Sequence, residues 1–145
     1  MTYLLETKNI IKKFKDQVVL NGIIMHVPEN QVYCLLGPNG AGKTTMMKIL
    51  TGMIPATSGN ITFDGHEWSR SDLANIGSLI ENAPLYGNLT ARENLKVITE
   101  LRNAQEADID KILQTVGLSN TGKKLSKNFS LGMKERLGIG LALVG

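Results

Sequence analysis

A glycine-rich segment carries the clearest chemistry in this sequence. It reads Gly37, Pro38, Asn39, Gly40, Ala41, Gly42, Lys43 and Thr44, and it matches the pattern G-x-x-x-x-G-K-[ST]. The glycines let the backbone curl around an anion with its N–H groups pointing inward. Lys43 can reach the outer phosphates of a nucleotide as a point charge, and the Thr44 hydroxyl is the hard oxygen ligand that Mg²⁺ prefers. The segment is therefore predicted to bind phosphate groups.

The flanking residues supply the elements that such a loop needs. The continuous apolar run 32–36 predicts a strand buried on both faces, with Cys34 as a small buried residue. A helix is expected from Lys43 to about Leu50. A strand before the glycines and a helix after them favour a phosphate loop over the alternative, a glycine-rich turn with a fortuitous lysine.

The rest of the chain changes from strands to helices. Apolar or β-branched stretches at 3–8, 18–27, 60–64 and 76–80 predict strands. Beyond them, Thr90 and Glu93 form a capping box at the start of a helix. Apolar residues at helical spacing recur there, again over 109–116, and again from 132 onward. This organisation predicts an α/β protein with a helical insertion.

Composition narrows the class of protein. The chain has 145 residues, 42% hydrophobic and 20% charged, which is typical of a folded domain. Its net charge of +3 is too small to indicate a nucleic-acid partner. One cysteine excludes an intrachain disulfide framework, and two histidines offer little for a metal site. We find neither a signal-peptide pattern nor a long apolar span, so a cytoplasmic protein is expected.

Residues 38–45, which extend the loop through Thr45, resemble the phosphate loop of ABC-transporter ATP-binding subunits. Three further landmarks occur in the order found in that family, so the resemblance covers nearly the whole chain. It implies an α/β fold, a P-loop NTPase of the ABC type with an N-terminal antiparallel β subdomain and a helical insertion. It also implies ATP and Mg²⁺ as cofactors, with residues 37–45 binding the nucleotide.

Two landmarks stand at Phe14 and Glu81. Phe14 takes the place of an aromatic residue that stacks on adenine in the family, and the alternative is a ring packed in the core. Glu81 takes the place of the family's Q-loop glutamine, which contacts Mg²⁺ and the attacking water. A glutamate keeps the oxygen ligand but adds a negative charge beside the γ-phosphate. The resemblance thus implies Lys43 and Glu81 as catalytic residues and Thr44 and Glu81 as metal ligands; an ordinary surface glutamate is the alternative.

The remaining landmark, residues 129–136, aligns with the family's signature motif. Ser130, Leu131, Gly132 and Met133 form a variant that resembles bacitracin- and lantibiotic-type immunity subunits. Ser130 is expected to cap a helix whose N-terminus can face an anion, and the alternative is an ordinary capped helix. In the family this motif contacts ATP held by the other subunit. The resemblance therefore implies a homodimer or pseudo-dimer of ATPase subunits.

The family's next landmark, the Walker B strand with its aspartate and catalytic glutamate, has no counterpart, since no Asp or Glu follows Glu135. We therefore expect the N-terminal portion of one ATP-binding domain, truncated before that strand. Its expected parts are a β-rich nucleotide-binding part at 1–84, a helical subdomain at 85–131 and the signature helix at 132–145. As a monomer, such a piece should bind ATP weakly or not at all and should not turn it over at a useful rate. Because an interior strand would be missing, oligomerisation, strand exchange or marginal stability is expected.

The leading interpretation is an energy-coupling ATPase subunit of an ABC exporter that confers immunity to an antimicrobial peptide such as a lantibiotic. It would work with membrane-embedded permease subunits at the inner face of the cell membrane. The alternative is a nucleotide-dependent binding and dimerisation module without hydrolysis. A P-loop small-molecule kinase is disfavoured, because it lacks a role for the signature and needs more arginines than the four present.

Overall fold

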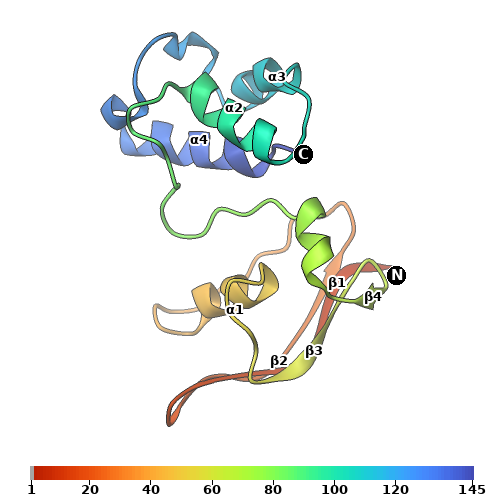
Figure 1. The fold of residues 1–145 in the computed structure, drawn as a ribbon. Helices are drawn as coiled ribbons and strands as arrows, with labels where there is room; N and C mark the ends of the chain where they lie inside the picture. The colour runs from red at the N-terminus through yellow and green to blue at the C-terminus, as the bar shows by residue number, and fades with distance from the viewer. Residues whose placement is uncertain (1) are drawn as a thin grey trace. The chain divides into compact units, whose positions relative to one another are not determined.

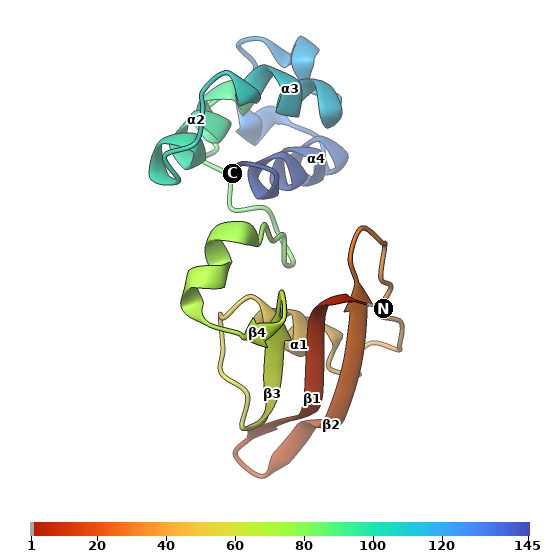
Figure 2. The same cartoon turned by 90° about the vertical axis from the view of Figure 1, so that its right-hand side faces the viewer.

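The computed structural model describes residues 2–145, which divide into two compact units, residues 2–73 and 74–145. Figures 1 and 2 show the strands in the first unit and helices α2, α3 and α4 in the second. The sheet of the first unit has the order β2-β1-β3-β4, and all its neighbours are antiparallel. Its strands are β1 (Tyr3–Phe14), β2 (Gln17–Pro28), β3 (Ser58–Phe63) and β4 (His66–Glu67). The expected antiparallel β part is confirmed.

The core of the first unit lies between this sheet and helix α1 (Lys43–Leu50). Strands β1 and β2 form a long hairpin, in which Phe14 pairs with Gln17 across the turn. Ile10 of β1 is buried together with Leu20 and Met25 of β2. Leu20 and Met25 are an odd number of residues apart, and a register shift between the pairs Ile10–Ile23 and Lys12–Leu20 brings both to the same face. The apolar face of α1 joins them through Met46 and Ile49. Hairpin and helix thus share one apolar core.

The predicted strands at 32–36 and 76–80 are wrong. Neither segment belongs to a strand among the described residues. Val32 is 94% exposed and Leu36 is 88% exposed, and Cys34 is exposed rather than buried. A strand exists only through hydrogen bonds to neighbouring strands, and the described sheet contains β1 to β4 alone. An apolar run without such partners stays irregular.

The second unit is helical, as expected. Helices α2 (Ala91–Leu101), α3 (Asp108–Thr115) and α4 (Leu131–Ala142) pack their apolar stripes around one core. Its fully buried members include Leu95, Ile109 and Leu137, one from each helix. Three short 3₁₀ turns complete the structure, η1 (Arg70–Asn75), η2 (Ser119–Thr121) and η3 (Ser126–Asn128). Over residues 2–145, no helix combines the length and apolar character needed to cross a membrane.

Candidate functional site: a phosphate loop and a capped signature helix

The glycine-rich loop leads directly into α1. Gly40 and Gly42 have left-handed backbones, with φ values of +82° and +91°. A Cβ atom at Gly42 would lie 2.6 Å from Leu20 Cδ2 and 3.0 Å from the carbonyl oxygen of Val19. Gly42 is therefore required twice, by its φ angle and by the close approach of the loop to β2. The loop is seated on the hairpin by this contact.

The N-terminus of α1 has no protein cap. Its N-cap residue, Gly42, offers no side chain, and the first turn contains no acidic residue. The first helical hydrogen bond runs from the Met46 N–H to the Gly42 carbonyl at 2.8 Å. Within residues 2–145, the N–H groups of Lys43, Thr44 and Thr45 donate to no backbone carbonyl. Together with the positive end of the helix dipole, these N–H groups make a site that fits an anion.

Lys43 folds back onto the loop. Its Nζ atom donates to the carbonyl oxygens of Gly37 at 2.6 Å and Pro38 at 2.7 Å. The ammonium group therefore already lies against the glycine-rich backbone. Phosphate oxygens are stronger acceptors for a charged donor than peptide carbonyls are. A bound phosphate can therefore draw Lys43 away from these two carbonyls with little movement of its backbone.

Thr44 offers an oxygen at the same end of α1. The residue is exposed, and its hydroxyl forms no hydrogen bond within the described part of the chain. Mg²⁺ takes hard oxygen ligands and keeps several waters, so one free hydroxyl beside bound phosphates suits it. Thr45 is half-buried in the same turn. The donor set at this end of α1 thus fits a nucleotide carrying Mg²⁺.

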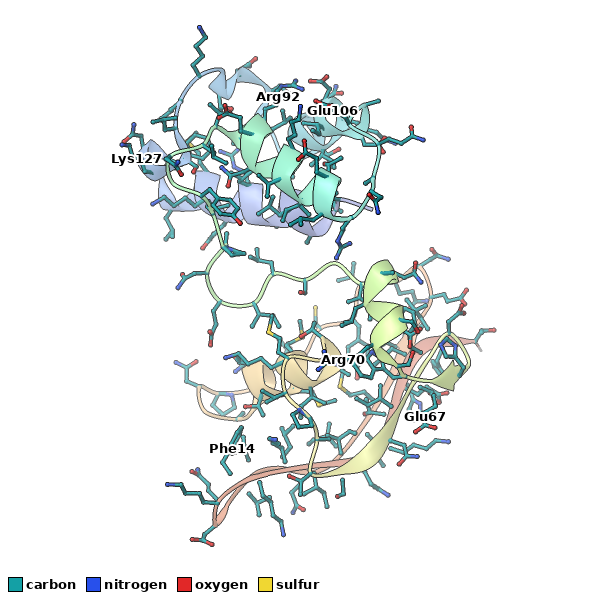
Figure 3. All side chains as sticks on the ribbon, viewed as in Figure 1. Phe14, Glu67, Arg70, Arg92, Glu106 and Lys127 are labelled. Atoms are coloured by element: carbon teal, nitrogen blue, oxygen red, sulfur yellow. The ribbon has the colours of Figure 1, made fainter. Side chains whose placement is uncertain are left out.

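Phe14 lies at the end of β1. Its side chain is 47% exposed, so the ring is not packed in the core. In Figure 3 the ring lies on the side of the hairpin that faces α1. Lys12 Nζ stands 4.9 Å from the ring centroid and also donates to the Pro55 carbonyl at 2.6 Å. A ring held in this way has free apolar surface for a flat partner.

Glu81 belongs to the second unit, in a segment that packs on α4. The residue is exposed, and its backbone φ of +63° is uncommon for residues other than glycine and asparagine. A Cβ atom at Gly138 would lie 2.6 Å from Ala83 Cβ and 2.9 Å from Leu79 Cδ1. The glycine in α4 thus allows the residues around Glu81 to approach the helix closely.

The signature residues open α4. Ser130 is the N-cap, as predicted, and its Oγ accepts a hydrogen bond from the Met133 N–H at 3.3 Å. Phe129 is buried and anchors the start of the helix, whereas Leu131 is 71% exposed. A Cβ atom at Gly132 would have no neighbour within 4 Å among the described residues. The first turn of α4 thus presents open backbone beside a capped N-terminus.

The structure groups the predicted residues by unit. Phe14 and residues 37–45 lie in the first unit, and Glu81 and residues 130–133 lie in the second. Sequence reasoning missed Asn94 and Ser126, which are each 1% exposed in the second unit. The available signal was a polar residue beside Leu95 on the buried side of a predicted helix. Asparagine favours caps and turns over helix interiors, so its position there needs a partner.

Comparison with known proteins gives consistent matches. The chain matches the family described as ABC transporter over residues 20–145. A lantibiotic transport ATP-binding protein of Streptococcus pyogenes is 50% identical over 97% of this chain and 62% of its own length. A bacitracin transport ATP-binding protein of Enterococcus faecalis is 38% identical over 99% of this chain and 48% of its own length.

Solved structures agree with these matches. An ATP-binding subunit of an ABC transporter superimposes with a TM-score of 0.82 and 26% identity, over 95% of this chain and 60% of that one. A nucleotide-free ATP-binding cassette gives the same TM-score over 98% of this chain and 65% of that one. This chain therefore spans roughly half to two thirds of the length of the proteins it matches.

Proposed function

This chain belongs to the ABC transporter family, and we propose that it supplies the ATP-binding portion of an ATPase that powers an exporter. Its fold is the expected ABC-type P-loop fold, as the superposition on ATP-binding subunits confirms. The observation that carries the proposal is the open N-terminus of α1. That end combines N–H groups without backbone partners, the Lys43 ammonium and the Thr44 hydroxyl in one turn.

The proposed chemistry follows from these groups. The N–H groups of the loop and of the first turn of α1 bind the phosphates, and Lys43 moves from the Gly37 and Pro38 carbonyls to the β- and γ-phosphates. Thr44 provides a ligand for Mg²⁺, which neutralises charge on the phosphates when bound. Phe14 stacks on the adenine. Glu81 has a carboxylate where the family's Q-loop has an amide. We propose that this carboxylate contacts the metal and the attacking water.

The transported substrate is proposed from the relatives. One matched protein is described as a lantibiotic transport ATP-binding protein and another as a bacitracin transport ATP-binding protein. We assign this chain to the same kind of system, which moves an antimicrobial peptide and protects the cell. It would act at the inner face of the membrane with separate permease subunits. Ser130 to Met133 would contact ATP bound by a second ATPase subunit.

The alternative of a binding and dimerisation module without hydrolysis is not favoured, because the matched relatives are transport ATP-binding proteins. Family membership also argues against a small-molecule kinase. The binding module and the transport ATPase differ in whether ATP is turned over. A module binds and releases ATP unchanged, whereas a transport ATPase releases phosphate repeatedly.

The test is nucleotide binding by calorimetry, followed by phosphate release. Lys43→Ala should weaken Mg·ATP binding roughly tenfold to a hundredfold, because it removes a charged donor to phosphate. Lys8→Ala, which removes an exposed lysine of β1, is the matched control and should bind as the wild type does. Phosphate release should be measured in a form extended to the length of the relatives. Unchanged binding by Lys43→Ala would contradict the assignment of the loop.

A further inference from the structure

A buried polar cluster joins two segments of the second unit. Asn94, on α2, is 1% exposed, and its Oδ1 accepts a hydrogen bond from the Tyr86 N–H at 2.8 Å. Its Nδ2, which carries two N–H donors, lies within hydrogen-bond distance of the carbonyl oxygens of Thr90 at 2.8 Å, Tyr86 at 3.2 Å and Leu89 at 3.3 Å. One side chain thus contacts backbone groups along the turn that precedes α2, with one acceptor and two donors to share among them.

Ser126, in η3, completes the cluster from the other side. Its Oγ donates to the Tyr86 carbonyl at 2.8 Å and lies 3.4 Å from Asn94 Nδ2. Its N–H donates to the Leu89 carbonyl at 2.8 Å, and the N–H of the next residue, Lys127, donates to the Gly87 carbonyl at 3.0 Å. We call Asn94, Ser126 and these backbone partners the Asn94–Ser126 clamp. The clamp holds residues 86–90 against residues 125–127.

The backbones in the clamp approach each other closely. Thr90 and Leu125 form an antiparallel β-bridge. A Cβ atom at Gly87 would lie 3.3 Å from Lys127 Cβ, which is a tight contact. The two segments therefore have a single register, and every side-chain polar group in the clamp is used to set it. A fully satisfied buried network of this kind specifies one arrangement rather than many.

The two segments lead to the residues proposed to sense ATP. Residues 86–90 follow the stretch around Glu81, which packs on α4 at Gly138. On the other side, η3 runs through buried Phe129 into Ser130, the cap of the signature helix. Contacts at Gly138 and in the clamp thus join the Glu81 stretch to the signature helix at two separate places. An apolar residue at position 94 would fill the core without creating this connection.

We propose that Asn94 and Ser126 are positioning residues that hold the signature turn and the segment after Glu81 in one arrangement. The inference rests on the proposed ATPase function. Neither side chain touches nucleotide in this assignment. Both act through Ser130 and Tyr86. When the signature turn binds phosphate and moves, the stretch around Glu81 therefore moves together with the signature turn.

The first test measures local opening in the 145-residue chain by amide hydrogen exchange. Ser126→Ala removes one hydroxyl with little change in volume and should accelerate exchange roughly fivefold to tenfold at residues 87–90 and 130–133. Thr99→Val is the matched control, because within residues 2–145 the buried Thr99 hydroxyl donates to the Leu95 carbonyl of its own helix, at 2.9 Å, and to no other segment. It should leave these amides unchanged. Equal effects of the two variants would overturn the clamp.

The second test measures steady-state ATP hydrolysis in a form extended to the length of the relatives. Ser126→Ala should lower kcat and kcat/KM together by several-fold and leave KM for ATP unchanged, because the signature contact forms only in the closed complex. Asn94→Asp, which keeps the acceptor for the Tyr86 N–H but removes both donors, should do the same. A variant that raises KM alone, or leaves kcat as in Thr99→Val, would contradict the positioning role. If the wild type does not hydrolyse ATP but Ser126→Ala still accelerates exchange as expected in the first test, the result would count against the proposed function and not against the clamp.

Discussion

The N-termini of α1 and α2 differ in whether the protein itself satisfies their first N–H groups. At α2 the protein does so itself: Thr90 Oγ1 accepts from the Glu93 N–H at 3.2 Å, and the Glu93 carboxylate accepts from the Thr90 N–H at 2.8 Å. At α1 the corresponding position is Gly42, which has no side chain and is followed by no acidic residue in the first turn.

The difference separates a helix end that the protein closes with its own side chains from one that it leaves open. A capping box uses the orphan N–H groups of a helix and places a carboxylate beside its positive end, which repels other anions. The start of α1 leaves both its N–H groups and its dipole for an external anion. The start of α4 lies between these cases, because Ser130 caps one N–H but no acidic residue stands in the first turn. Capping chemistry alone thus orders the three ends by their capacity to bind phosphate.

Gly42→Ala gives the largest expected effect, because it alters the open end without adding a cap. The alanine would have to adopt the left-handed backbone of Gly42, and its Cβ would lie 2.6 Å from buried Leu20. We expect the free energy of unfolding of the first unit to fall by about 2–4 kcal/mol, as measured by chemical denaturation. Gly40→Ala is the control, since φ there is +82° but no described atom lies within 4 Å of the added Cβ. Its cost should be about 1–2 kcal/mol, and equal losses in both variants would refute the role of the close contact.

Thr44→Ala should come next, and it separates the metal from the phosphate. With Mg²⁺ present, ATP affinity should fall by about tenfold, because one oxygen ligand is lost. With Mg²⁺ chelated, wild type and variant should bind ATP equally. Calorimetry under both conditions measures the difference. A loss of the same size without Mg²⁺ would assign the Thr44 hydroxyl to phosphate instead.

Thr90→Ala tests the closed end. Removing the cap should lower the free energy of unfolding of the second unit by about 1 kcal/mol, the usual cost of deleting a Thr N-cap. ATP affinity should not change, since the α2 terminus has no ligand role. Thermal unfolding and calorimetry on the same sample provide the two readouts. Weaker ATP binding in this variant would remove the contrast between the two helix ends.

Local signals account for what the sequence predicted correctly. The helix that starts at Lys43 and the Thr90–Glu93 capping box each depend on residues within one or two turns. Their physics is contained in the sequence pattern itself, so it can be read without a structure. The N-cap at Ser130 is of the same kind.

Long-range contacts account for what the sequence could not predict. The run 32–36 has the composition of a buried strand, but a strand depends on neighbours that the pattern does not reveal, and Cys34 is exposed as a result. The clamp was missed for the same reason. Asn94 is a poor helix former in isolation, and its role appears only when Ser126, which lies on another segment, is brought beside it.

The pH dependence of the capping box gives the smallest effect. The backbone hydrogen bond from Thr90, and then its hydroxyl, hold the pKa of Glu93 below the ordinary glutamate value of 4.5. The folded state therefore binds this proton less readily than the unfolded state does. Its stabilising contribution is complete above pH 4.5 and is lost as the pH falls through the lowered folded-state pKa. Unfolding curves measured from neutral to acidic pH should converge for wild type and Glu93→Gln at the acidic end. If the two proteins differed in free energy of unfolding by the same amount at all pH values, the charge of the Glu93 carboxylate would play no part. The N-terminus of α2 would then be stabilised by its hydrogen bonds without a contribution from that charge.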